Sequence, residues 1–157
     1  MTLVIGTSLG TAVVAAAGMW WALNRRRSMI GRSSRTLLIA ATVTPLALLS
    51  WKVTWSVLYP RALDPWPGRM GFRCLQLSLL LGVLPLSALL FARRGTDPTH
   101  PGVAAFSFGV SVGLCVALFV DLWCPVGYVP HVLLGHMLPI GLLGLAGFCM
   151  GKKLLAP

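Results

Sequence analysis

Six side chains of this sequence are of types that take part in chemistry, and each lies near one end of a long apolar run. They are Lys52, Cys74, Asp121, Cys124, His131 and His136. Two thiols can be oxidised to a disulfide or can bind a soft metal ion, and a lysine can pair with an aspartate. The chain has no glutamate, no paired carboxylates and no Ser-His-Asp set in a plausible context. We therefore expect a protein that is not an enzyme.

The elements that must position these side chains are five apolar runs. The 157-residue chain is 57% hydrophobic and 10% charged, whereas soluble domains carry about 25% charged residues. Each run approaches the roughly 20 residues that a helix needs to cross about 30 Å of hydrocarbon. The runs cover about 3–23, 36–58, 74–92, 103–123 and 131–150. They predict an all-α, polytopic membrane helix bundle with five transmembrane helices, in which residues 1–157 form a single domain.

The basic residues between these runs predict the orientation of the bundle. If the helices alternate, one side of the membrane carries Arg25, Arg26, Arg27, Arg32, Arg35, Arg93, Arg94, Lys152 and Lys153. The other side carries Arg61, Arg69 and Arg73. Positive charges concentrate on the cytoplasmic side, so we expect the N-terminus outside and the C-terminus in the cytoplasm. This distribution accounts for the net charge of +10 without nucleic acid, and no direct nucleic-acid binding is expected.

The same orientation gathers the chemically active side chains at the outer end of the bundle. Lys52 and Asp121 lie within apolar runs, where a charged group is costly unless it has a partner. An ion pair between them would satisfy both charges. In the alternative, the Lys52 ammonium reaches outward to the headgroups and Asp121 already lies in interfacial water.

Cys74 and Cys124 form the more informative pair of residues. Both are expected on the outer face, and in a bacterium with a periplasm that compartment is oxidising, so disulfides persist there. A disulfide requires Cα atoms within about 7 Å, which neighbouring antiparallel helices can supply. Cys115 and Cys149 are expected to be apolar packing residues.

A metal site is the rival interpretation of this outer end. Cys74, Cys124, His131 and His136 are ligand types that suit Zn²⁺ or softer ions. However, His131 and His136 are five residues apart, and this spacing places them on different faces of an α-helix. The sequence therefore favours a protein without a bound cofactor.

Small residues recur at the four-residue spacing that lets helix backbones approach closely in membranes. The pairs are Gly6 with Gly10, Gly109 with Gly113, and Gly147 with Gly151. They predict helix contacts, unless they only reflect how common glycine is in membrane helices.

From Gly71 to the C-terminus, several motifs follow one another in a characteristic order. They are Arg73-Cys74-Leu75, Pro85, the turn RRGTDPTHPG at 93–102, Asp121-Leu122-Trp123-Cys124-Pro125, and a glycine-rich helix with His131 and His136. Upstream, Trp51-Lys52 and Tyr59-Pro60 fit more loosely. In order and spacing these motifs resemble the NrsF-type membrane anti-sigma-factor family.

This resemblance implies a regulator of transcription. Members of the family hold an extracytoplasmic-function sigma factor at the inner face of the bacterial cytoplasmic membrane, and an external stress releases it. Two periplasmic cysteines take part in sensing, and by motif they correspond to Cys74 and Cys124. Family members commonly have six helices and more N-terminal sequence. The five runs seen here therefore raise the question of which cytoplasmic segment binds the sigma factor.

We accordingly expect a multi-pass inner-membrane protein that sequesters such a sigma factor and senses periplasmic redox or heavy-metal stress through a cysteine pair. Its partners would be the lipid bilayer and the sigma factor, while the oligomeric state stays open. The alternative is a structural or accessory subunit of a membrane complex with no signalling role. A small transporter is a third interpretation, but one lysine, one aspartate and one histidine near one surface do not make an ion pathway.

Overall fold

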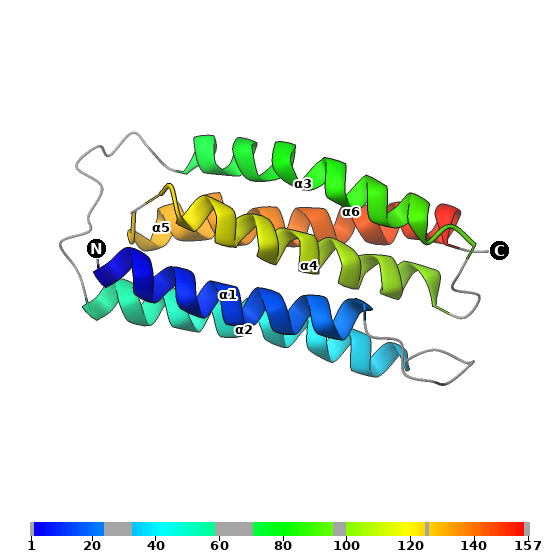
Figure 1. Ribbon diagram of the computed structural model, residues 1–157, viewed down its shortest axis with the longest axis horizontal. Helices are drawn as coiled ribbons and strands as arrows, with labels where there is room; N and C mark the ends of the chain where they lie inside the picture. Colours follow the sequence, from blue (N-terminus) through cyan, green and yellow to red (C-terminus); the bar gives the residue numbers. More distant parts are fainter. Residues whose placement is uncertain (1, 24–32, 59–70, 96–99, 125, 156–157) are drawn as a thin grey trace.

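Five long helices lie side by side and alternate in direction, forming one elongated bundle (Figure 1). The computed structural model describes residues 2–23, 33–58, 71–95, 100–124 and 126–155. The first four helices are α1 (Thr2–Leu23), α2 (Ser34–Leu58), α3 (Phe72–Ala92) and α4 (Pro101–Asp121). The fifth is built of three consecutive pieces, α5 (Val129–Val132), the π-helix η1 (Leu133–Met137) and α6 (Leu138–Leu154).

All five helices are long and apolar enough to cross a membrane, with mean hydropathies between 1.2 and 2.4. For the part of the chain that the structure describes, the prediction of an all-helical protein with five such helices is thereby confirmed. A helix satisfies its own backbone hydrogen bonds, which is the condition for placing a chain in hydrocarbon.

Several basic residues that we expected in connections or in a tail lie in helix ends instead. These are Arg35, Arg73, Lys152 and Lys153. Arginine and lysine are good helix formers whose stems can lie along apolar surface, so they extend a helix past its apolar run. Other basic residues lie outside the described residues, namely Arg25, Arg26, Arg27, Arg32, Arg61 and Arg69.

Helix α4 lies at the centre of the bundle and packs against α1, α2, α3 and α6. Its most apolar stretch is 72% buried, against 22% for each of the first three helices. The outward faces of those helices are apolar, with exposed side chains such as Val13, Leu80 and Leu84. Such faces are unfavourable in water by about 25 cal/mol per Å², and hydrocarbon removes that penalty.

Glycines set the distance between α4 and α6. A Cβ atom at Gly109 would collide with the backbone carbonyl of Leu143, and one at Gly147 with that of Ala105. At the other pair of helices, Gly6 and Gly10 of α1 lie against the rings of Trp55 and Trp51 of α2. The glycine spacing in the sequence thus correctly predicted close helix contacts.

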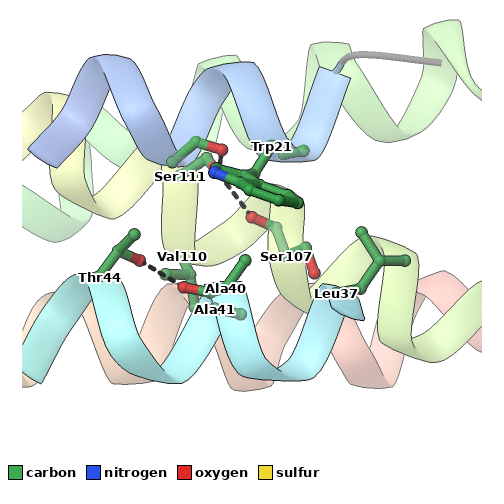
Figure 2. Close-up of a pocket in the computed structure, with 10 residues that line it drawn as sticks. Trp21, Leu37, Ala40, Ala41, Thr44, Ser107, Val110 and Ser111 are labelled. Atoms are coloured by element: carbon green, nitrogen blue, oxygen red, sulfur yellow. Dashed lines mark hydrogen bonds between the residues drawn. The ribbon is translucent and has the colours of Figure 1, made fainter. Parts of the chain in front are cut away.

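A small pocket lies between α1, α2 and α4, lined by Trp21 of α1, by Leu37 and Thr44 of α2, and by α4 (Figure 2). Its hydroxyl groups are satisfied by backbone carbonyls. Thr44 Oγ1 donates to the Ala40 carbonyl at 2.8 Å. Ser111 Oγ donates to the Gly18 carbonyl of α1 at 3.0 Å, and this bond helps to fix α1 on α4.

Candidate functional site

The carboxylate of Asp121 is the centre of a buried polar network. Asp121 is the last residue of α4, and its side chain is 3% exposed. Lys52 Nζ of α2 lies 2.5 Å from Oδ1. Thr11 Oγ1 of α1 donates to Oδ2 at 2.6 Å. His136 Nδ1 of η1 lies 2.8 Å from Oδ1. One carboxylate of α4 therefore contacts three of the other four long helical segments.

The Lys52 side chain is 4% exposed and points into the bundle, so its ammonium does not reach out to headgroups. A buried charge is strongly unfavourable unless it is paired and hydrogen-bonded. Here the ammonium and the carboxylate neutralise each other, and Thr11 and His136 surround the remaining carboxylate surface. Thr11 is fully buried. Nothing in its sequence context distinguishes it from other small residues of an apolar helix, so sequence reasoning missed it.

Next to this network lies a cluster of two thiols and two imidazoles. Cys74 comes from the start of α3, Cys124 from just beyond α4, His131 from α5 and His136 from η1. The two sulfur atoms are 3.6 Å apart, and both cysteines are free thiols. His131 Nε2 lies 3.1 Å from the Cys124 sulfur and 3.5 Å from the Cys74 sulfur. The four ligand atoms all lie within 4.8 Å of one another.

The π-helix η1 corrects the expectation that His131 and His136 lie on different faces. Their ring centroids are 5.6 Å apart. The Leu138 N–H donates to the Leu133 carbonyl, five residues back, and this widened turn aligns residues five apart. The cause is visible in the sequence. Pro139 has no N–H, so the α-helical bond to the Gly135 carbonyl cannot form.

The freed Gly135 carbonyl instead accepts a hydrogen bond from the buried Ser78 hydroxyl of α3, at 3.5 Å. Two glycines allow α3 to come this close. Gly71 precedes α3 with φ 79°, in the left-handed region that favours glycine. A Cβ atom there would lie 2.9 Å from the His131 carbonyl oxygen, and one at Gly135 would lie 2.9 Å from Cβ of Cys74. These two glycines therefore position Cys74 against the histidines.

The electrostatics of the cluster single out Cys124. The Cys74 S–H donates toward the Cys124 sulfur and lowers the pKa of the Cys124 thiol far below its usual value. His131 and His136 lower it further, whereas burial opposes the shift. The thiolate is the nucleophilic and metal-binding form of cysteine, and the hydrogen bond between the two sulfurs favours one thiolate within the pair.

The other two cysteines and the remaining basic residues lie away from this cluster. Cys115 is partly buried in α4, and Cys149 is exposed in α6. The described basic residues predicted to be cytoplasmic are Arg35, Arg93, Arg94, Lys152 and Lys153. They occupy the start of α2, the end of α3 and the end of α6, at the end of the bundle opposite the thiols (Figure 1). The Arg93 guanidinium lies over the Phe108 ring, and the Lys152 ammonium over the Phe148 ring.

Comparison with known proteins supports one family. A family model described as NrsF, negative regulator of sigma F, matches residues 2–156. The anti-sigma-F factor NrsF of Caulobacter vibrioides (strain NA1000 / CB15N) is 39% identical to the chain over 77 residues. These residues make up 49% of this chain and 36% of the Caulobacter protein, so the chain spans less than two thirds of that relative. No solved structure matches the chain.

Proposed function

Because the chain belongs to the NrsF family of negative regulators of sigma F, as its motifs predicted, we propose that it is an anti-sigma factor embedded in the bacterial inner membrane. The family consists of regulators and not of enzymes, which agrees with the absence of a catalytic set in the sequence. The observation that carries the proposal is the family match across residues 2–156, in a chain with five helices able to span a membrane. Residues 1–157 would form one transmembrane domain.

In this proposal the basic end of the bundle faces the cytoplasm and binds an extracytoplasmic-function sigma factor. The N-terminus then lies in the periplasm and the C-terminus in the cytoplasm. Support comes from the separation of charges, because Arg94 and Lys153 are exposed at the end opposite the thiols, and positive residues favour the cytoplasmic side. The basic segment with Arg25, Arg26, Arg27 and Arg32 would add to this surface. Such a surface complements an acidic patch on a soluble partner.

The thiol pair would then be the sensor, on the periplasmic side. On oxidation, Cys74 and Cys124 together lose two protons and two electrons to a disulfide or peroxide oxidant, and an S–S bond forms. The sulfurs must move from 3.6 Å to about 2.05 Å, which shifts the start of α3 against the end of α4. A thiophilic heavy-metal ion bound by both sulfurs would act on the same two segments. The signal follows if the shifted arrangement binds the sigma factor less tightly.

The proposal is tested by recovery of the partner. We expect a tagged chain, purified from membranes in mild detergent after co-expression with the sigma factor of its own operon or genome neighbourhood, to retain that factor stoichiometrically. Deleting the chain should raise transcription from a promoter dependent on that factor. Recovery of a large membrane complex without any sigma factor would contradict the proposal and would favour an accessory subunit.

A matched pair of variants locates the binding surface. We expect Arg94→Ala with Lys153→Ala to weaken sigma-factor binding several-fold at low salt, because exposed charges at an interface rim mainly accelerate association. Arg73→Ala is the control, since Arg73 is also exposed but lies at the thiol end of α3. Both proteins should unfold at the same temperature. If Arg73→Ala and the double variant lose sigma-factor binding equally in the pull-down from membranes, the binding surface does not lie at the basic end of the bundle.

The orientation has its own test. Tyr128 precedes α5 at the thiol end, Lys153 lies in the last turn of α6 at the basic end, and both are exposed. In intact spheroplasts a membrane-impermeant maleimide should label Tyr128→Cys and spare Lys153→Cys, as read by peptide mass mapping. After the membrane is permeabilised, both positions should react. The opposite pattern in intact spheroplasts would invert the orientation.

A further inference from the structure

We propose that Cys74, Cys124, His131 and His136 form a tetrahedral site for one Zn²⁺ ion, and that His136 connects this site to the buried Asp121–Lys52 pair. Binding of the ion is independent of the proposed regulatory function. Its effect on the sigma factor rests on that function, and the two are tested separately below.

The spacing of three of the four ligand atoms is close to that of tetrahedral zinc, and all four atoms lie within 4.8 Å of one another. With Zn–S near 2.3 Å and Zn–N near 2.05 Å, tetrahedral geometry places two sulfurs about 3.8 Å apart and a sulfur and a nitrogen about 3.6 Å apart. The two sulfurs are 3.6 Å apart. The distances from His131 Nε2 to the two sulfurs are 3.5 and 3.1 Å. Two thiolates and two imidazoles also exclude Mg²⁺ and Ca²⁺, which take oxygen ligands.

His136 supplies an independent observation. Its side chain is 2% exposed, and among the described residues Nε2 has no well-formed hydrogen bond, although the ring also lies beside Cys124. A buried ring nitrogen that lacks a well-formed hydrogen bond is costly. The other nitrogen, Nδ1, faces the Asp121 carboxylate at 2.8 Å. A zinc-binding histidine characteristically turns one nitrogen to a carboxylate and the other to the metal. This arrangement keeps the proton on Nδ1 and leaves the Nε2 lone pair free for the ion.

The charges balance in this buried position. When Zn²⁺ binds, both cysteines bind as thiolates and any remaining thiol proton leaves to solvent, so that two thiolates cancel the two positive charges of the ion. The neighbouring Lys52–Asp121 pair is already neutral. The occupied site therefore adds no net charge to the interior of the bundle. A cation held by neutral ligands alone would add a buried, uncompensated positive charge.

The site is also connected to the rest of the bundle. Oδ1 of Asp121 contacts both His136 Nδ1 and Lys52 Nζ, and Oδ2 accepts from Thr11. An ion that orders the His136 ring orders the carboxylate as well, and with it the contacts to α1 and α2. The thiols are contributed by α3 and the end of α4. Zinc occupancy thus holds all five long helical segments in one arrangement, which we assign to the state that binds the sigma factor.

Metal binding is measured directly on the full chain in detergent. We expect one Zn²⁺ per chain by elemental analysis. Titration with Co²⁺ should give the visible bands of tetrahedral coordination together with thiolate-to-cobalt charge-transfer absorption. Zn²⁺ should also raise the unfolding temperature of the metal-free protein. A wild-type chain that binds no Co²⁺ at equimolar concentration, or shows only octahedral bands, would overturn the inference whatever its effect on the sigma factor.

Variants with matched controls assign the ligands. Cys124→Ser should lose charge-transfer absorption, and His131→Gln should lose the bands of tetrahedral coordination. Both variants should bind the metal ion at least 100-fold more weakly than the wild type. Cys149→Ser and His100→Gln should behave as the wild type. Asp121→Asn should keep the tetrahedral spectrum with affinity lowered about 10–100-fold, as expected for a residue that orients a ligand. Unchanged binding in His131→Gln would exclude His131 as a ligand and overturn the four-ligand site.

The link to function has separate outcomes. If the wild type binds one Zn²⁺ and retains the sigma factor, chelation of the ion should release that factor. Retention of the sigma factor after complete chelation would overturn the coupling and leave the proposed function standing. Zinc binding by a chain that never retains a sigma factor would overturn the proposed function and leave the zinc site standing.

Discussion

Replacing Asp121 by alanine is expected to lower the free energy of unfolding by about 3–5 kcal/mol, the usual effect of removing one partner of a buried ion pair. The substitution leaves the Lys52 ammonium buried with no counter-charge. It also removes one of the two acceptors of Thr11 Oγ1, the other being the Thr7 carbonyl, and it removes the carboxylate beside His136. Because the four groups come from α1, α2, α4 and η1, the loss should loosen the whole bundle. Reversible unfolding of the purified chain in mixed detergent micelles measures the effect.

A double-mutant cycle separates the pair from its surroundings. Lys52→Met alone should also destabilise the chain, since it leaves the carboxylate without its cation. Adding Lys52→Met to Asp121→Ala should cost less than the sum of the two single changes, because the double variant buries no unpaired charge at this position. Lys153→Met is the matched control, since Lys153 is exposed in the last turn of α6. Strictly additive effects would mean that the two charges do not interact in the folded protein.

Much of this architecture is readable from the sequence because it depends on local properties. Length and apolarity determine where a chain can cross hydrocarbon, so the five helices agree with the five runs to within a few residues at most ends. Glycines four residues apart lie on one face of a helix whatever surrounds them, and Gly109 and Gly147 do line the contact between α4 and α6. The gathering of Cys74 and Cys124 at one end follows from simple alternation of the helices.

The remaining features depend on departures from regular geometry or on contacts across the bundle. His131 and His136 would lie on different faces of a helix with 3.6 residues per turn, and η1 departs from that geometry. Pro139 was the available signal, because it removes the α-helical partner of the Gly135 carbonyl. Thr11 carried no signal at all, since its contact with Asp121 joins residues 110 positions apart. The left-handed conformation of Gly71 is likewise set by its neighbours in space.

Replacing both thiols, Cys74→Ser with Cys124→Ser, is expected to abolish induction of the sigma-dependent promoter by oxidants and by thiophilic metals. Serine keeps the size and polarity of the position but forms neither a disulfide nor a strong bond to a soft ion. The double variant should therefore remain in one signalling state under stress. Cys115→Ser with Cys149→Ser is the control and should respond like the wild type, because neither residue lies in the thiol cluster. A promoter reporter in cells, read with and without stress, measures the response.

A single histidine variant distinguishes the two chemistries of the same thiols. A disulfide between Cys74 and Cys124 needs only the two sulfur atoms, whereas a tetrahedral ion also needs His131 and His136. Loss of the ion has the same effect as chelation, so His131→Gln should raise promoter activity without stress and lose the sensitivity to zinc chelation seen in the wild type. A disulfide-forming oxidant such as diamide should still join Cys74 to Cys124 in this variant, as read by alkylation of the remaining thiols. If His131→Gln keeps the response to chelation, the ion is not part of the switch. If it no longer forms the disulfide, the imidazole acts on the thiols themselves, since His131 is among the groups that hold the Cys124 pKa low.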